Sequence, residues 1–377
     1  MLGILPRGSD RNPTSPRIVY NPALDGLRAI AVLLVLADHC HVPGFEPGYF
    51  GVDLFFVLSG FLITQLLVVE LDATGSINLI GFYARRFLRL SPALTLLLFT
   101  YVLIGPLLWP QFTLGEHIRD AVLAGLYLSD YAQAFWHIPK VLLHTWSLSV
   151  EEHFYLLWPF AILLLGRLRL RSGMLVLVTM YLMATAWREY DYTSMGWDAV
   201  YFRFDTRISG LICGALVAMW LKRFGPISED MANKVGVLAC ATLAVCLSIG
   251  FWGAPWSITI LTNIAHVAAT GALLALSVRN SWLKSLLSVP PLVGIGVVSY
   301  GIYLWHYPVA VYFRDQLSWY VTFPIVLTVA IAVATASYYS IERPLQRYRR
   351  AFAERRQADA ASVGAERSVP LRDSAVL

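Results

Sequence analysis

The sequence contains few charged residues for its length. Only 14% of its 377 residues are Asp, Glu, Lys or Arg, whereas 57% are hydrophobic. A soluble globular domain carries roughly 25% charged and about 45–50% apolar residues. The basic residues occur in short clusters between apolar runs, which argues against a nucleic-acid partner. The composition therefore predicts an all-α protein, a polytopic transmembrane helical bundle in contact with lipid.

Several chemical signatures are also missing. The four cysteines lie in or beside apolar runs without metal-ligand spacing, so small buried hydrophobic side chains are their expected role. No P-loop, dinucleotide fingerprint, HExxH motif or GxSxG elbow is present. The first twenty residues are too polar and proline-rich for a signal peptide. We therefore expect no metal site, no permanently bound cofactor, and a first span that serves as an uncleaved anchor.

Ten apolar stretches predict about ten membrane spans. They lie at about 24–42, 50–70, 90–109, 146–165, 173–188, 202–221, 235–252, 256–278, 290–312 and 320–340. The mixed segment 111–145 is expected to be amphipathic or re-entrant. Polar residues 1–22 and 345–377 are expected to be flexible cytoplasmic tails on either side of a membrane domain at 23–344.

The basic residues fall in loops on one side of this ten-span arrangement. They are Arg85, Arg86, Arg89, Arg167, Arg169, Arg171, Lys222, Arg223, Arg279, Lys284, Arg343, Arg347, Arg349 and Arg350. The positive-inside rule then places both termini in the cytoplasm.

The stretch LDGLRAIAVLLVLADHC, residues 24–40, carries ionisable groups inside a span. Arg28 and His39 are eleven positions apart and share one helical face at a separation of about 16 Å. Ionisable groups within a membrane usually mark function. The His39 imidazole could take a proton from a hydroxyl, or it could be a structural histidine bonded to a neighbouring helix. Asp38 is adjacent in sequence but points about 100° away.

A second polar group lies in HTWSLSVEEHFYLLWP, residues 144–159. Glu151, Tyr155 and Trp158 share a face at the i, i+4, i+7 spacing. A carboxylate there could orient a histidine or bind a substrate hydroxyl. It could equally be an exposed acidic residue of a first helical turn. The sequence favours neither interpretation.

A third group is the arginine run FYARRFLRLSP, residues 82–92, expected just before the third span. Arg85 and Arg89 share a face, with Arg86 beside them. Guanidinium groups suit the phosphate oxygens of a donor substrate. The alternative is an anchor on lipid headgroups.

Other polar residues within the apolar stretches are expected to pair with one another. They are Asp53, Ser59, Arg203, Asp205, Arg207, Asn263, His266, His306 and Glu342. Gly210 and Gly214 form a small-xxx-small pair that favours close helix packing.

Seven segments, in order from Leu24 to Pro344, resemble those of the membrane-bound acyltransferase 3 family. They are LDGLRAIAVLLVLADH, GVDLFFVLSGFLIT, RRFLRLSPA, HTWSLSVEEHFYLLWP, YFRFDTRISGLICGAL, SYGIYLWHYPV and IERP. Members of this family are bacterial O-acyltransferases of surface polysaccharides, lipopolysaccharide, nodulation factors and macrolides. The resemblance implies a multi-pass protein of the bacterial inner membrane.

The resemblance also implies roles for individual residues. His39 matches the family's catalytic base, with Glu151 or Asp38 as its carboxylate partner. The residues implied for acyl-coenzyme A, the donor substrate, are Arg28, Arg85, Arg86, Arg89 and Glu342. The residues expected at the acceptor are Asp205, Arg207, His306 and Tyr155.

The implied reaction transfers an acyl group, most simply acetyl, to a hydroxyl of a carbohydrate-type or lipid-linked acceptor. Transfer is either direct or through an acylated His39. Many relatives carry an extra-cytoplasmic SGNH-type domain that this sequence does not show. We therefore expect either a stand-alone enzyme or one that works with a separate periplasmic acyl-handling partner. The alternative function is a transporter or acyl carrier.

Overall fold

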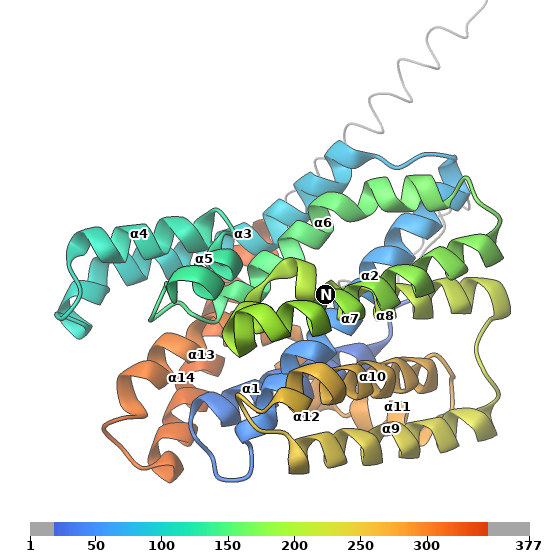
Figure 1. The fold of residues 1–377 in the computed structure, drawn as a ribbon. Coiled ribbons are helices and arrows are strands. Elements are labelled where there is room, and N and C mark those ends of the chain that lie inside the picture. The colour runs from blue at the N-terminus through green and yellow to red at the C-terminus, as the bar shows by residue number, and fades with distance from the viewer. Residues whose placement is uncertain (1–18, 346–377) are drawn as a thin grey trace, which may run out of the picture.

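The computed structural model describes residues 19–345, which form helices joined by short loops, without a β-strand in this range (Figure 1). The α-helices are α1 Pro22–His39, α2 Phe50–Thr74, α3 Leu79–Leu108, α4 Leu114–Gly125, α5 Ser129–Trp136, α6 Thr145–Leu165, α7 Leu170–Phe202, α8 Phe204–Phe224, α9 Glu229–Ile249, α10 Thr262–Leu276, α11 Trp282–Leu287, α12 Pro290–Val297, α13 Ser299–Phe313 and α14 Trp319–Ser337. Short helical turns at Glu46–Tyr49, Ser257–Leu261 and Tyr338–Glu342 adjoin α2, α10 and α14. The predicted all-α fold is confirmed. The predicted tails lie almost wholly outside the described residues, as do Arg347, Arg349 and Arg350.

Eight of the described helical segments are long and apolar enough to cross a membrane, or nine if α12 and α13 form one span. The sequence predicted about ten. The difference is α1, which has 18 residues but carries Asp25, Arg28 and Asp38. Helices α12 and α13 meet at 71°, so the predicted span at 290–312 is a broken one. The chain is a multi-pass membrane protein, while the orientation of its termini stays a prediction.

Two helices are longer than the apolar stretches of the sequence predicted. Helix α3 begins at Leu79, where the side-chain oxygen of Asn78 accepts a hydrogen bond from the backbone N–H of Gly81 at 2.8 Å. The arginine run therefore lies within α3 and not before it, which corrects the predicted boundary. Helix α7 has 33 residues, interrupted by one non-helical residue at Gly196.

The segment 111–145 contains the two short helices α4 and α5. Thr113 and Glu116 cap the start of α4 reciprocally, each side chain bonding the other's backbone N–H. This segment lies beside the ends of α3 and α6 (Figure 1). It covers one end of the bundle and leaves the long helices exposed along their flanks.

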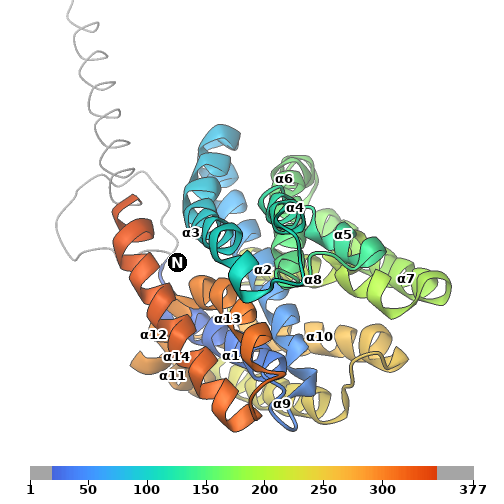
Figure 2. The same ribbon diagram turned by 90° about the vertical axis from the view of Figure 1, so that its left-hand side faces the viewer.

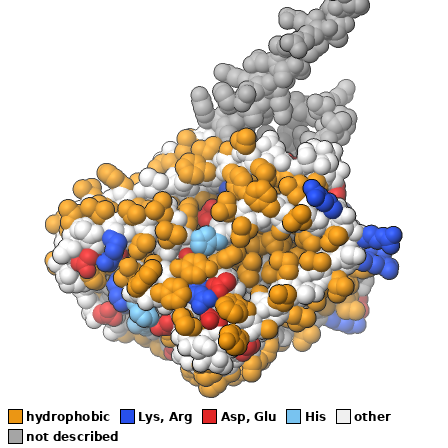
Figure 3. All heavy atoms as spheres, turned by 45° about the horizontal axis from the view of Figure 1, so that its top comes forward, with side chains coloured by type: hydrophobic (Ala, Val, Ile, Leu, Met, Phe, Trp, Pro, Cys, Tyr) orange, Lys and Arg blue, Asp and Glu red, His pale blue; other side chains and the backbone are white. Residues whose placement is uncertain are grey.

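Helix α1 lies inside the bundle. It packs against α2, α12 and α13, and Figure 2 shows it surrounded by other helices. Figure 3 shows hydrophobic side chains across the flank of the molecule and a group of Lys and Arg side chains at the right-hand end. This distribution suits an apolar belt in lipid with a basic face in water.

Helices α2 and α8 pack unusually closely. A Cβ atom at Gly214 would lie 1.8 Å from the carbonyl oxygen of Val57, and one at Gly60 would lie 1.8 Å from that of Leu211. Only glycine permits the two backbones to come this near. The expected close contact at Gly214 is confirmed.

Candidate active site

A cavity of about 250 Å³ lies between α1, α2, α3, α6 and α13. Its lining brings together residues that the sequence singled out on three separate helices: Arg28, Arg85, Arg86, Arg89, Glu151 and Tyr155. Four guanidinium groups thus face one carboxylate among the ionisable side chains of the lining. The cavity is therefore strongly cationic and suited to an anionic ligand.

The arginines of the cavity differ in their ion-pair partners. Arg28 donates to Asp25 at 2.7 Å, and the Tyr20 hydroxyl donates to the other oxygen of this buried carboxylate at 2.7 Å. Arg85 lies 3.4 Å from Glu70. Within residues 19–345, Arg86 forms no ion pair, and its Nε is buried without a hydrogen-bond partner. An anion in the cavity would satisfy that group.

Glu151 belongs to a short hydrogen-bond chain on the wall of the cavity. The Tyr155 hydroxyl donates to Ser59 at 3.2 Å, and the Ser59 hydroxyl donates to the Glu151 carboxylate. Tyr155 and Glu151 lie one turn apart on α6, as the sequence predicted, while Ser59 comes from α2. Glu151 is thus a half-buried cavity residue and not the exposed first-turn carboxylate that the sequence also allowed.

His39 lies at the other end of α1 and does not line this cavity. Its Nδ1 is 2.8 Å from Nε2 of His306, and the two rings are stacked at 5.1 Å between centroids. The Tyr307 ring meets His39 edge-on at 4.6 Å. The hydrogen-bonded partner of His39 among the described residues is therefore a histidine. Neither Glu151 nor Asp38, the expected carboxylates, contacts it.

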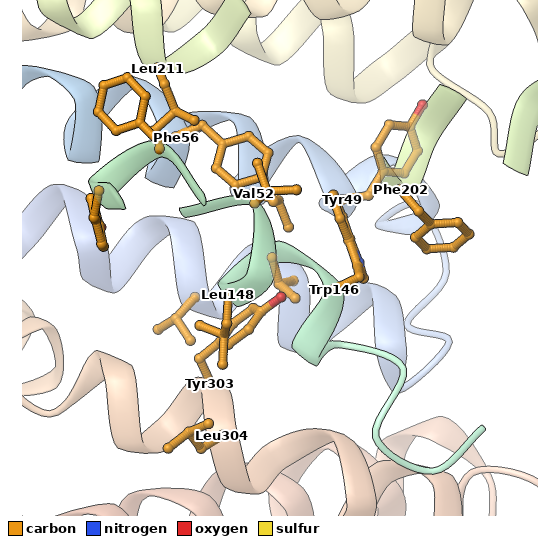
Figure 4. Close-up of a cluster of buried hydrophobic side chains, with 14 of the residues drawn as sticks. Tyr49, Val52, Phe56, Trp146, Leu148, Phe202, Leu211, Tyr303 and Leu304 are labelled. Atoms are coloured by element: carbon orange, nitrogen blue, oxygen red, sulfur yellow. The ribbon is translucent and has the colours of Figure 1, made fainter. Parts of the chain in front are cut away.

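Tyr303 connects the cavity with the histidines. It lines the cavity, and its ring centroid lies 5.4 Å from that of His306. Its hydroxyl is bonded to Ser147 at 2.6 Å and to the backbone carbonyl of His144 at 3.0 Å. Figure 4 shows Tyr303 reaching from α13 toward Leu148 and Trp146 of α6. Tyr303 thus adjoins both the cationic cavity and the histidine group.

The remaining predicted site residues lie away from the cavity lining. Arg207 donates to the buried Asp53 at 2.8 Å, and Asp205 accepts hydrogen bonds from Arg203 and, at 2.7 Å, from Trp187. Both residues are thus paired with other side chains, an arrangement that the sequence also allowed.

Glu342 and Asp38 also lie outside the lining. Glu342 is buried in the turn after α14, where it accepts a hydrogen bond from Ser337 at 3.4 Å. Asp38 packs against Gly48 and forms no ion pair within the described range.

Three residues of this region were not proposed as site residues from the sequence, namely His144, Ser147 and Tyr303. His144 is fully buried, with its ring 5.7 Å from that of His306 and 5.2 Å from that of Tyr307. His144 and Ser147 stand in the HTWSLSVEE motif, so the motif itself was the available signal. No group of three or more His, Cys, Asp or Glu side chains in residues 19–345 is arranged to hold a metal ion.

The fold and the cavity define a class, a multi-pass helical membrane protein with a cationic pocket beside buried histidines. Residues 21–341 match the family model described as "Acyltransferase domain". The chain therefore belongs to this membrane-bound acyltransferase family, as its motifs predicted.

Curated relatives agree with this assignment. The chain is 35% identical over 358 residues to the O-acetyltransferase OatA of Staphylococcus aureus, covering 88% of this chain and 58% of that protein. It is 32% identical over 356 residues to the peptidoglycan O-acetyltransferase OatA of Listeria monocytogenes, covering 87% and 56%. It is 32% identical over 351 residues to the putative peptidoglycan O-acetyltransferase YrhL of Bacillus subtilis, covering 87% and 55%. The chain thus spans little more than half the length of these relatives. No solved structure matches it.

Proposed function

We propose that this protein is a membrane O-acyltransferase that moves an acyl group, most simply acetyl, from acyl-coenzyme A to a hydroxyl of a carbohydrate. The observation that carries the proposal is the cavity with four arginines that ends, at Tyr303, beside the group containing His39. The names of the relatives support a glycan acceptor, and peptidoglycan is the first to test.

The donor binds with its phosphates on Arg85, Arg86 and Arg89. Coenzyme A is a polyanion, and guanidinium groups bind phosphate oxygens through paired, charge-assisted hydrogen bonds. The buried Nε of Arg86 supplies an unused donor for this purpose. Arg28 lines the same cavity and supplies a further cationic group for the donor.

His39 acts as general base at the far end of this path. Its imidazole takes the proton of the acceptor hydroxyl while the oxygen attacks the thioester carbonyl. A C–O bond forms, the C–S bond breaks, and the thiolate of coenzyme A leaves and is protonated. Acylation of His39 itself would divide the same transfer into two steps. In either route the glycan gains one ester and coenzyme A is released as the free thiol.

Release of coenzyme A tests the proposal. The protein in lipid nanodiscs is given acetyl-coenzyme A with peptidoglycan fragments, and free thiol and acetylated glycan are both measured. His39→Gln should lower the rate by about 10²- to 10⁴-fold, the usual contribution of a general base. His41→Asn, an exposed residue two positions away in the following loop, should leave it unchanged.

Two outcomes would contradict the proposal. Uptake of substrate into vesicles without thiol release would identify a transporter. Thiol release with acyl-protein but no acetylated glycan would identify a carrier that needs a separate acyl-handling partner.

A further inference from the structure

His39 and His306 form a hydrogen-bond chain that ends on the protein backbone. Nδ1 of His39 is 2.8 Å from Nε2 of His306. Nδ1 of His306 is 2.7 Å from the carbonyl oxygen of Tyr303 and 3.2 Å from that of Ile302. The chain therefore runs from α1 through one side chain of α13 to backbone carbonyls of α13 itself.

The direction of this chain follows from its last link. A carbonyl oxygen only accepts hydrogen bonds, so Nδ1 of His306 must carry a proton. A neutral imidazole has one N–H, which leaves Nε2 of His306 as an acceptor. Nδ1 of His39 must then donate to it, and Nε2 of His39 is left without a proton. The backbone thus determines the protonation pattern of both rings.

The surroundings hold this arrangement in place. His306 is fully buried, and its ring lies nearly parallel to that of His39, at 13°. Tyr307 closes the edge of His39, and His144 packs against both His306 and Tyr307. His39 is half-buried, and within residues 19–345 its Nε2 has no hydrogen-bond partner. The one ring nitrogen of this pair that can accept a proton is thereby left available.

We propose that His306 is a positioning residue that fixes His39 in its Nδ1–H tautomer, so that Nε2 of His39 is the basic atom. The catalytic consequence rests on the function proposed above, whereas the tautomer does not. When Nε2 takes a proton, His39 keeps its Nδ1–H bond to His306, and the positive charge is stabilised by a neutral acceptor. His306 therefore does for His39 what a carboxylate does for the histidine of a serine hydrolase, without a buried negative charge.

The tautomer can be measured directly. The full-length protein, ¹⁵N-labelled only at histidine and reconstituted in lipid bilayers, is examined by magic-angle-spinning NMR at a pH where histidine is neutral. The His39 signals are assigned by their loss in His39→Gln. A protonated Nδ1 and an unprotonated Nε2 are expected for His39. The opposite pattern would overturn the proposal, whatever the activity of the protein.

Two variants of His306 separate positioning from packing. A Gln side chain can place its carbonyl oxygen near the position of Nε2, whereas an Asn side chain ends near Nδ1 and falls short of His39. In His306→Gln the Nδ1–H tautomer and most of the activity should remain. In His306→Asn the Nδ1–H tautomer of His39 should be lost. We expect kcat to fall by about 10- to 100-fold at unchanged KM for acetyl-coenzyme A. This fall in kcat is smaller than the one that follows removal of the carboxylate that sets the histidine tautomer in a serine hydrolase.

Equal losses in the two variants, with the His39 spectrum unchanged, would overturn the proposal and leave His306 as a packing residue. If neither variant folds, the spectrum of the unmodified protein decides. An Nδ1–H tautomer in a protein that releases no coenzyme A would refute the proposed function and keep this inference.

Discussion

The guanidinium group of Arg86 lies over the ring of Tyr155, with its central carbon 4.1 Å from the ring centroid. The Tyr155 hydroxyl is in turn bonded to Ser59, which is bonded to Glu151. The arginine on α3 is therefore held in a fixed position by α6 and α2 before any ligand enters. Such preorganisation lowers the entropic cost of binding a phosphate.

Replacing Arg86 should weaken donor binding in particular. Arg86→Ala removes a charge-assisted contact worth about 1.5–3 kcal/mol, so KM for acetyl-coenzyme A should rise by roughly 10- to 100-fold. Arg86→Lys keeps the charge but loses the planar stack on Tyr155 and the paired hydrogen bonds. Its KM for acetyl-coenzyme A should lie between that of the unmodified protein and that of Arg86→Ala. Thiol release at varied donor concentration measures both.

Arg171→Ala is the matched control, since this exposed arginine lies outside the cavity lining. Its donor KM should equal that of the unmodified protein. An Arg86 variant that changes KM for the acceptor and leaves KM for the donor intact would remove the donor-site assignment.

Glu151→Gln should separate charge from structure. The amide oxygen of glutamine can still accept the hydrogen bond from Ser59, so the protein should fold and elute as a single species in size-exclusion chromatography. We expect kcat to fall by at least about tenfold, because the cavity loses its one carboxylate. Loss of the protein from the membrane would instead make Glu151 a structural residue.

The buried pair Asp53–Arg207 should behave as structure. Asp53 accepts from Arg207 at 2.8 Å and from His266 at 2.9 Å, and all three side chains are almost completely buried. Asp53→Ala leaves an uncompensated cation and should destabilise the fold by about 3–5 kcal/mol. The thermal unfolding midpoint in detergent measures the loss.

Two further variants check this assignment. Asp53→Ala combined with Arg207→Met should recover part of the lost stability, because no buried charge is then left alone. Asp230→Ala breaks an exposed pair with Lys234 and should cost less than about 1 kcal/mol. Full thermal stability of Asp53→Ala with lost activity would place this pair in the catalytic machinery.

The sequence predicted most spans because membrane helices are continuous apolar runs. It placed the end of α7 too early because the second half of that helix is polar. In the structure those polar groups are paired internally: Arg188 donates to Ser209 at 2.9 Å and to Asn263 at 2.6 Å, and Asp191 meets Arg203 at 2.5 Å. Hydropathy cannot show that a charged residue has a partner on another helix.

The sequence identified several residues of the candidate site but not which of them contact one another. The family resemblance implied roles for Arg86, Arg89 and Glu151, and the fold brings these three residues to one cavity. Nothing in the pattern related His39 to His306, which lies 267 positions away. The adjacent carboxylate Asp38 and the acidic motif were the natural candidates from sequence. The packing of α13 against α1 determines the partner instead.

The excess of positive charge around the cavity has a thermodynamic consequence. Arg28 and Arg85 have carboxylate partners in Asp25 and Glu70, but Arg86 has none within residues 19–345. An anionic ligand in the cavity would therefore make a favourable interaction that the empty protein lacks. A ligand that binds only the folded state at 100 times its Kd adds about 2.7 kcal/mol of stability. Under the proposed function, the melting temperature of this protein would therefore rise with the concentration of the acyl donor, and the protein without donor would be the less stable form.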